Sequence, residues 1–456
     1  MKKYVSEVVD ELGMSRFVWK VYLLVGLAMI FDGFDYMIVS YTMPQISKEW
    51  ALTKVQTGSL ASWSLLGLIF GGMVAGILSD RIGRKRTLIL SCVLYSLFTI
   101  PIFFAQSYEM FAIFRVLSGF GLGACIPVSA TINSEFAPSK YRGFFIASSF
   151  SWLVAGWVMA GLVAMAVVPH WGWRYCYLIG GLPILYALIL AALLPESPHW
   201  LVSKGRNAEA VGVIRAMERA ARGSAREWSP EGLLVPPPPK SVGVAALFSR
   251  EYRLATVGLW IMYFMGCVII YGVTAWMPTL LYEKGLSLTK SYGFAIMQNA
   301  ASIVANGVAG LTSDKMGRKK NIIFSFIVCT LAVVLMANAA GTLGILAACI
   351  FLGFASNLAL TSVQPLIAET YRTEFRNTGV AWTHAFGRIG GFLAPIMAGY
   401  VQQLGIGFTG TMLWFIMPSL IGAVAPVFFV RYETRGKSLE SIIGEFSGKA
   451  PDASGH

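Results

Sequence analysis

Long apolar segments recur along the whole chain and are separated by short polar stretches. A helix needs around 20 predominantly apolar residues to cross a bilayer core of about 30 Å. The apolar segments are continuous and lack the alternation of lipid-facing strands, so they predict helices and not a barrel. We therefore predict an all-α membrane protein with twelve transmembrane helices, near residues 18–42, 57–79, 86–106, 110–134, 144–168, 173–194, 254–281, 292–312, 321–340, 343–366, 378–402 and 409–431.

Lysine and arginine gather in alternate loops, and this indicates the orientation of the chain. Cytoplasmic loops of membrane proteins carry an excess of these residues. The intervening loops, such as SKEW, HWGW and GIGFTG, are short and carry few basic residues. Both termini are therefore predicted to be cytoplasmic. The basic segments are the long central loop and DRIGRKR, KYR, DKMGRKK, YRTEFR and RYETRGK.

The composition is typical of a membrane protein, because 56% of the 456 residues are hydrophobic and only 13% are charged. A soluble domain carries about 25% charged residues. The net charge of +13 follows from the basic loops, so we expect no nucleic-acid partner. The sequence contains no nucleophile elbow, phosphate-binding loop or metal-spaced set of histidines and cysteines. We therefore expect neither an enzyme activity nor a metal or other cofactor.

The first residues predict an amphipathic helix before the first span. Val5, Val8, Val9 and Leu12 recur at helical spacing in a charged segment. Such a helix is typical of the membrane interface, where its apolar face is buried among lipid headgroups. We therefore expect this helix to lie on the membrane and to lead into the first span.

An internal repeat divides the chain into two halves. The segment GILSDRIGRK (76–85) returns as GLTSDKMGRK (310–319), 234 residues later. Repeats with an even number of spans have the same orientation in the membrane. The repeat therefore predicts two six-helix bundles. The same offset relates Met43 to Met277, Glu135 to Glu369, Arg142 to Arg376, and Gly156 to Gly390.

We predict three parts of the chain: an N-terminal bundle with its amphipathic helix (1–196), a cytoplasmic linker (197–250), and a C-terminal bundle with a short cytoplasmic tail (251–456). The linker is charged and rich in proline. Residues 205–223 predict a short helix, and PPPPK predicts a stiff extended spacer. A connection that lets the two bundles move explains this segment better than a dedicated binding module does.

Ionisable residues lie inside the predicted spans, where a charge costs at least about 2.5–3.5 kcal/mol. Asp32 and Asp35 project from nearly the same face of the first helix. Two carboxylates in a partly dehydrated site raise the pKa of at least one of them, as a proton carrier requires. Asp35 could instead pair only with an arginine. Arg115, Arg388 and His384 are candidates for binding the substrate or for the proton network.

The aspartates belong to one half only. At the offset of 234 residues, Gly266 and Ile269 stand in place of Asp32 and Asp35. This asymmetry argues against a shared scaffold role and for coupling to protons. Further candidates for the lining of a substrate site are the polar and aromatic residues Tyr36, Tyr271, Trp276, Gln298, Asn299 and Gln364.

Two parallel six-helix halves, each with G-x-x-x-D-(R/K)-x-G-R-(R/K) after its second helix, resemble the major facilitator superfamily. In that family the loop motif acts as a latch that stabilises the outward-open state. An aspartate of the motif can face the positive N-terminus of a helix or pair with a basic residue such as Arg142 or Arg376. The resemblance thus implies a conformational latch made of Asp80, Arg84, Glu135, Arg142, Asp314, Arg318, Glu369 and Arg376.

DGFD in the first helix and GRIGG in the eleventh are similar to the aromatic acid:proton symporters of that superfamily. This resemblance implies that Asp32 and Asp35 couple to protons. It also implies that Arg388, with Arg115 as a second candidate, holds the substrate carboxylate. The segments PESPHWLVSKGR and VDELGMSRFVWK depart from that group and resemble sugar and organic-ion porters, including nicotinate carriers.

We therefore expect a monomeric symporter of the cytoplasmic membrane that imports a small organic carboxylate, with an aromatic acid as the first choice. A nicotinate, sialate or sugar-acid carrier is the alternative. The motif G-x-x-x-G-P-x-x-G-G is missing from the fifth helix, which disfavours a drug antiporter. An efflux antiporter and a transporter-like sensor stay open at this point.

Overall fold

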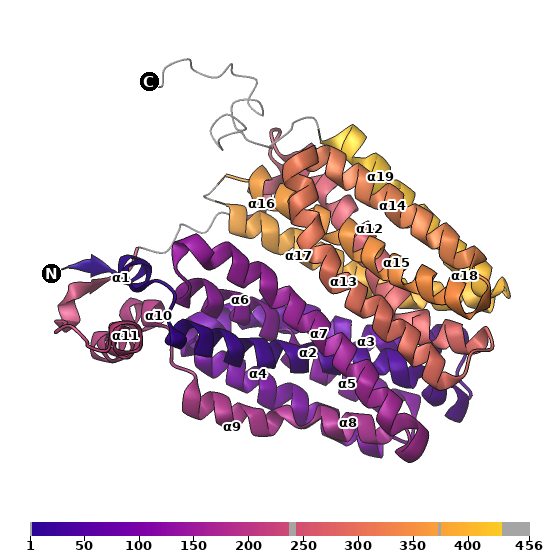
Figure 1. Ribbon diagram of the computed structural model, residues 1–456, viewed down its shortest axis with the longest axis horizontal. Helices are drawn as coiled ribbons and strands as arrows, with labels where there is room; N and C mark the ends of the chain where they lie inside the picture. The colour runs from indigo at the N-terminus through magenta and orange to yellow at the C-terminus, as the bar shows by residue number, and fades with distance from the viewer. Residues whose placement is uncertain (1, 237–242, 373–374, 431–456) are drawn as a thin grey trace. The chain divides into compact units, whose positions relative to one another are not determined.

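The computed structural model describes residues 2–236, 243–372 and 375–430, almost all of them in α-helices (Figure 1). The strands within these residues are two short segments, β1 (Lys3–Tyr4) and β2 (Leu233–Leu234), which pair in parallel. The all-α prediction is therefore confirmed. RYETRGK, part of YRTEFR and most of PPPPK lie outside the described residues.

Eleven helical segments of the described chain are long and apolar enough to cross a membrane, where we predicted twelve. The predicted span 378–402 corresponds to α17 (Arg376–Gln403), which is 28 residues long but is not among the eleven. A histidine, an arginine and several glycines lower its hydropathy. The first six segments are formed by α2 (Arg16–Glu49), α3 (Lys54–Ile82), α4 (Arg84–Thr99) with η1 (Ile100–Phe104), α5 (Tyr108–Leu122) with α6 (Cys125–Phe136), α7 (Ser139–Trp171), and α8 (Arg174–Gly180) with α9 (Pro183–Leu193).

The second half of the chain repeats this order of elements. Here α12 packs against α17 and α19, and α15 packs against α13 and α14. Proline stands in the first turn of α16, where its missing N–H has no helical partner to lose. The elements are α12 (Arg253–Glu283), α13 (Leu288–Met316), α14 (Arg318–Asn338), α15 (Gly341–Ser362) with α16 (Gln364–Thr370), α17, and α18 (Gly407–Trp414) with α19 (Ile416–Phe429).

Two glycines of the repeated loop motif form tight turns between helices. Gly83 joins α3 to α4 with φ +104°, and Gly317 joins α13 to α14 with φ +87°. Residues with a Cβ atom rarely adopt a positive φ of this kind, so glycine is required at these two positions. The other two motif glycines, Gly76 and Gly310, have open space at the position of a Cβ atom. Within the described residues, close contact between helices therefore does not explain why glycine stands at these two positions.

The N-terminal helix α1 (Val5–Leu12) packs on protein, whereas the sequence predicted that it lies in the membrane interface. Its apolar residues are buried in one core cluster with the central helix α11 (Asn207–Arg222). The amphipathic pattern was correctly recognised, but a helix and not lipid covers the apolar face. The contact residues are Val5, Val8, Val9 and Leu12 of α1 and Ala210, Val211, Ile214 and Met217 of α11.

Ion pairs fasten α1 to the central segment. Glu11 pairs with Lys3 and, at 3.0 Å, with Arg226, and hydrogen bonds from these two cations lower the pKa of Glu11. Arg226 also contacts Glu218, a buried residue of α11, at 2.9 Å. The part of the central segment that contains α11 and Arg226 is therefore ordered and packed against α1, and is not only a spacer.

Close contacts divide the chain into two compact units, Met1–Thr42 with Trp63–Pro238 and Met43–Ser62 with Pro239–His456. We expected the first part to end at residue 196. The remaining central elements, α10 (Pro198–Ser203), α11, η2 (Pro230–Gly232) and β2, belong to the first unit, and η3 (Val244–Phe248) belongs to the second.

Candidate functional site

Asp35 and Arg115 form a fully buried ion pair in the first unit. Arg115 Nη1 donates to Asp35 Oδ2 at 2.9 Å, and Nη2 donates to the Asp35 carbonyl oxygen at 3.0 Å. Thr99 Oγ1 donates to the other carboxylate oxygen at 2.6 Å. Both ionic side chains are 0% exposed. The structure thus joins two residues 80 positions apart that the sequence analysis treated separately.

This pairing changes the expected role of Arg115. We expected Arg115 to bind the substrate or to belong to the proton network. The buried guanidinium is engaged by Asp35, and its Nε has no partner among the described residues. Arg115 is therefore not available to a substrate in this state. Its charge instead compensates that of Asp35, as a buried carboxylate requires.

Asp32 lies one helical turn from the ion pair and is 2% exposed. It is close enough to Cys92, Tyr95 and Cys125 to interact with them electrostatically. The two aspartates thus have different known neighbours: Asp35 is bound to Arg115, and Asp32 lies near Cys92, Tyr95 and Cys125.

A close helix crossing explains how both carboxylates become buried. A Cβ atom at Gly33 would collide with the carbonyl oxygen of Leu153 in α7, and one at Gly156 would collide with that of Ile30. Small residues allow transmembrane helices to approach this closely. Helix α2 continues through Gly33 without a break, so Asp32 does not cap a helix end there. The crossing therefore buries the turn of α2 that carries Asp32 and Asp35 inside the helix bundle.

In the second unit, His384, Gln364 and Tyr263 form a connected polar group. His384 Nε2 lies 3.0 Å from Gln364 Oε1, and Gln364 Nε2 donates to the Tyr263 hydroxyl at 3.3 Å. The Tyr263 and His384 rings are stacked with centroids 4.8 Å apart. The amide orientation makes His384 Nε2 the donor, which leaves Nδ1 as an acceptor.

Arg388 lies one turn beyond His384 on α17 and is partly exposed. No hydrogen bond or ion pair joins it to another of the described residues. It is near enough to Tyr263, Cys267 and His384 to interact with them electrostatically. Arg388 therefore differs from Arg115 in two ways that suit a ligand for an anion, namely access and an uncompensated charge.

The aromatic candidates have different surroundings. Trp276 is 0% exposed, and its Nε1 donates to the Pro395 carbonyl oxygen at 2.8 Å, so it serves packing and is closed to a ligand here. Tyr36 is also buried, 6.1 Å from the ring of Trp157. Tyr271 is partly exposed beside Gly391 of α17, which leaves it a candidate.

Gln298 and Asn299 are each 1% exposed. A Cβ atom at Gly353 of α15 would collide with the Gln298 carbonyl oxygen, so α13 and α15 are in close contact at this point. The Gln298 side-chain amide has no partner among the described residues. The two residues are thus buried where α13 crosses α15.

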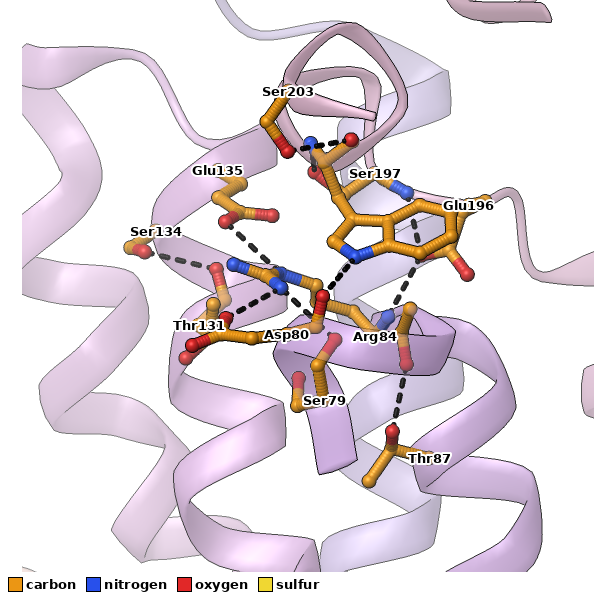
Figure 2. A network of polar contacts seen from close by, with 12 residues as sticks. Ser79, Asp80, Arg84, Thr87, Thr131, Ser134, Glu135, Glu196, Ser197 and Ser203 are labelled. Atoms are coloured by element: carbon orange, nitrogen blue, oxygen red, sulfur yellow. Dashed lines mark hydrogen bonds and ion pairs between the residues drawn. The ribbon is translucent and has the colours of Figure 1, made fainter. Parts of the chain in front are cut away.

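The first loop cluster consists of Asp80, Arg84, Glu135 and Glu196, and its three acidic residues surround Arg84 (Figure 2). Arg84 Nη1 contacts Asp80 at 2.9 Å, and Arg84 Nε contacts Glu135 at 3.3 Å. Glu196 Oε1 accepts hydrogen bonds from the backbone N–H groups of Arg84 (2.9 Å) and Lys85 (3.1 Å). A carboxylate therefore does bind the N-terminus of α4, but it is Glu196 and not the motif aspartate.

The second loop cluster, which consists of Asp314, Arg318 and Glu369, repeats the arrangement. Arg318 contacts Asp314 at 2.7 Å and donates two hydrogen bonds, of 2.8 and 3.1 Å, to the Glu369 carboxylate. The motif aspartates thus pair with Arg84 and Arg318. Our suggestion of Arg142 and Arg376 as their partners was wrong for this structure.

Arg142 and Arg376, which do not pair with the motif aspartates, contact other groups. Arg142 Nη2 donates to Ser139 Oγ at 3.5 Å, and Arg376 Nε donates to the Tyr371 carbonyl oxygen at 3.4 Å. His199 of α10 lies near Arg142 and Arg84; its burial and these two cations lower its pKa to about 4. His199 is therefore neutral at pH 7.

Sequence reasoning missed Glu196 and Trp200 as members of the first cluster. Trp200 Nε1 donates to the Asp80 carbonyl oxygen at 3.0 Å. Both residues belong to PESPHWL, which was noted only for its resemblance to sugar porters. An acidic residue between two prolines at the end of a span was the available signal.

Comparison with known proteins identifies the family. The model of the Major Facilitator Superfamily matches residues 25–395 and 294–451. The chain is 30% identical over 436 residues to the niacin transporter NiaP of Acinetobacter baylyi, with 95% of this chain and 98% of that protein covered. It is also 30% identical over 430 residues to the 4-hydroxybenzoate transporter PcaK of Pseudomonas putida, with 93% and 95% covered.

The solved structures agree with the family at the level of the fold. The partially occluded inward-open structure of the xylose transporter XylE from E. coli aligns with a TM-score of 0.73 at 19% identity. The alignment covers 93% of this chain and all of that chain. At this identity the likeness concerns the fold and not the substrate.

Proposed function

We propose a specific transport activity for this chain, which belongs to the Major Facilitator Superfamily and is a multi-pass membrane transporter and not an enzyme. It is a proton-coupled symporter that imports a small aromatic carboxylate by alternating access. The observation that carries the proposal is the contrast between two arginines. Arg115 is buried and bound to Asp35, whereas Arg388 is partly exposed and has no ion pair within the described residues.

The substrate class is supported by the relatives. Niacin and 4-hydroxybenzoate are both single aromatic rings with a carboxylate, and a benzoate transport protein of A. baylyi is 28% identical over 431 residues. The guanidinium of Arg388 can form two parallel hydrogen bonds to such a carboxylate. His384, Gln364 and Tyr271 lie on the same or neighbouring helices and offer polar and aromatic contacts for the ring.

Proton coupling is assigned to the aspartates of α2. Protonation of Asp35 would release Arg115 from its ionic partner among the described residues, and protonation of Asp32 would remove a negative charge from a buried site. Either event changes the net charge buried in the first unit by one. Because a buried charge is costly, such a change can bias the protein between two conformations.

The remaining parts of the proposal follow the sequence predictions. The protein is a monomer of the cytoplasmic membrane with twelve spans, α17 being the eleventh along the chain, and both termini are cytoplasmic. The bundles are residues 1–196 and 251–456, joined by 197–250. The proton is its coupling ion, and it uses no cofactor. The two loop clusters hold one state of the transport cycle.

Proteoliposomes containing the purified protein test this function. We expect an inward proton gradient to drive accumulation of labelled benzoate, 4-hydroxybenzoate or nicotinate above its equilibrium level. Arg388→Lys should raise KM at least tenfold, since a point charge replaces a planar fork. Arg253→Lys, at an exposed arginine that begins α12, is the matched control and should behave as wild type.

Other outcomes would identify the alternatives. Accumulation of sialate or a sugar acid in place of aromatic acids would change the substrate. Proton-driven export would make the protein an antiporter, and saturable binding without flux would indicate a sensor. Equal KM values for wild type and Arg388→Lys would place the carboxylate elsewhere.

A further inference from the structure

A cavity lies far from the loop cluster of the second unit, at the opposite ends of its helices. Its volume is about 240 Å³. All its lining residues belong to the second unit, in which Met43–Ser62 is included. Gly405 and Gly407, with φ +78° and +65°, turn the chain along one side of it. The side chains that line the cavity are Lys54, Leu280, Glu283, Lys284, Gln402 and Phe408.

The two lysines of the cavity differ in how their charge is compensated. Lys54 forms an ion pair with Glu283. Lys284 makes no ion pair within the described residues. Its Nζ donates to the Ala339 carbonyl oxygen at 2.8 Å and lies 4.0 Å from the centre of the Phe408 ring. The lining therefore carries one net positive charge, and burial lowers the pKa of Lys284, as expected for a cation without an anion.

Gln402 provides an independent sign of a missing ligand. Its side chain is more than nine-tenths buried and lines the same cavity. Its Nε2 has no hydrogen-bond partner among the described residues. Buried amide groups are almost always hydrogen-bonded, so this donor calls for an acceptor inside the cavity. A carboxylate would accept from Gln402 and from Lys284 together.

We propose that this cavity is a second binding site for a small aromatic carboxylate, separate from Arg388. The carboxylate contacts the Lys284 ammonium and the Gln402 amide, and the ring lies against Leu280 and Phe408. Pockets for drug-sized ligands have about 300–1,000 Å³, so a cavity of this smaller size suits a single ring. The choice of ligand rests on the proposed function, whereas the need for an anion rests on the cavity itself.

The site would also affect the neighbouring ion pair. A bound carboxylate competes with Glu283 for Lys54, because both anions lie in the same cavity. Binding there therefore concentrates the transported anion at this end of the second unit and loosens the contact between Lys54 and Glu283. This predicts that the cavity captures substrate without taking part in proton coupling.

Binding of 4-fluorobenzoate to the full-length protein in lipid nanodiscs tests the proposal by 19F NMR titration. We expect two classes of site. Arg388→Gln should remove one class, and the double variant K284Q/Q402L should weaken the other at least tenfold. Lys284→Arg retains the charge and should retain binding, whereas Gln402→Glu keeps the size, adds a negative charge and should abolish it.

Lys290→Gln is the matched control, since it removes an exposed cation near the start of α13 that does not line the cavity. Size-exclusion profiles show which variants are folded. A single class of site that is lost in Arg388→Gln and unchanged in K284Q/Q402L would overturn the inference and leave the proposed function intact. Binding that survives Arg388→Gln and is lost in K284Q/Q402L supports it, even if proteoliposomes show no uptake.

Discussion

Breaking the buried ion pair between Asp35 and Arg115 should destabilise the protein strongly. Both side chains are 0% exposed, and each is the sole ionic partner of the other among the described residues. Removal of one partner leaves an uncompensated buried charge, which costs about 3–5 kcal/mol. We therefore expect Arg115→Met and Asp35→Asn each to lower the free energy of unfolding by about this amount.

The double variant D35N/R115M separates this explanation from a simple loss of packing. With both charges removed, no unpaired charge remains, so its cost should not exceed that of the worse single variant. The interaction energy in the double-mutant cycle should then be about 3 kcal/mol or more. Thr99→Val, which removes only the hydrogen bond to Asp35, should cost about 1.5–3 kcal/mol.

Equilibrium unfolding in mixed micelles of dodecylmaltoside and SDS, followed by tryptophan fluorescence, measures these free energies. The exposed pair Arg206 and Glu209 serves as control, and R206Q/E209Q should show no comparable coupling. Strictly additive effects of Asp35→Asn and Arg115→Met would refute the reasoning, because they would mean that neither charge depends on the other.

Two further predictions concern helix packing and pH. Gly33→Ala should lower the free energy of unfolding by about 1–3 kcal/mol, since its methyl group collides with the Leu153 carbonyl oxygen. Gly76→Ala, which has open space around it, should be neutral or stabilising. Equal effects of the two substitutions in the same unfolding assay would contradict the close crossing of α2 and α7. His199 has a folded-state pKa of about 4, below its ordinary value of 6.5, so its neutral form is favoured by folding and stability is lost as the pH falls through this window. From pH 7.5 to 5 the loss should be about 2 kcal/mol, and it should be missing in His199→Gln when the two pH profiles are compared.

The membrane architecture could be predicted because it depends on local composition. Apolar runs and the doubled motif lie within short stretches of sequence, and Gly83 and Gly317 of that motif have a positive φ that favours glycine. The hydropathy of α17 is low because the helix contains His384 and Arg388, the same residues that make it a candidate for substrate binding.

Contacts between distant segments could not be predicted in the same way. Asp35 and Arg115 are 80 residues apart, and nothing in either helix names its partner. Glu196 binds the N-terminus of α4 from 112 residues away, a position we had assigned to an aspartate of the motif. For α1, an amphipathic pattern indicates a covered face but does not distinguish lipid from the helix α11 that covers it.

The central claim is that the carboxylates of α2 couple transport to protons, and counterflow compared with uphill uptake tests it most directly. Proteoliposomes with wild type, Asp32→Asn or Asp35→Asn are loaded with unlabelled substrate and assayed for exchange of labelled substrate. The same preparations, without internal substrate, are assayed for accumulation under an imposed proton gradient. We predict that both variants lose accumulation while at least one, Asp32→Asn, retains exchange. Accumulation at the wild-type level in both variants would contradict the account.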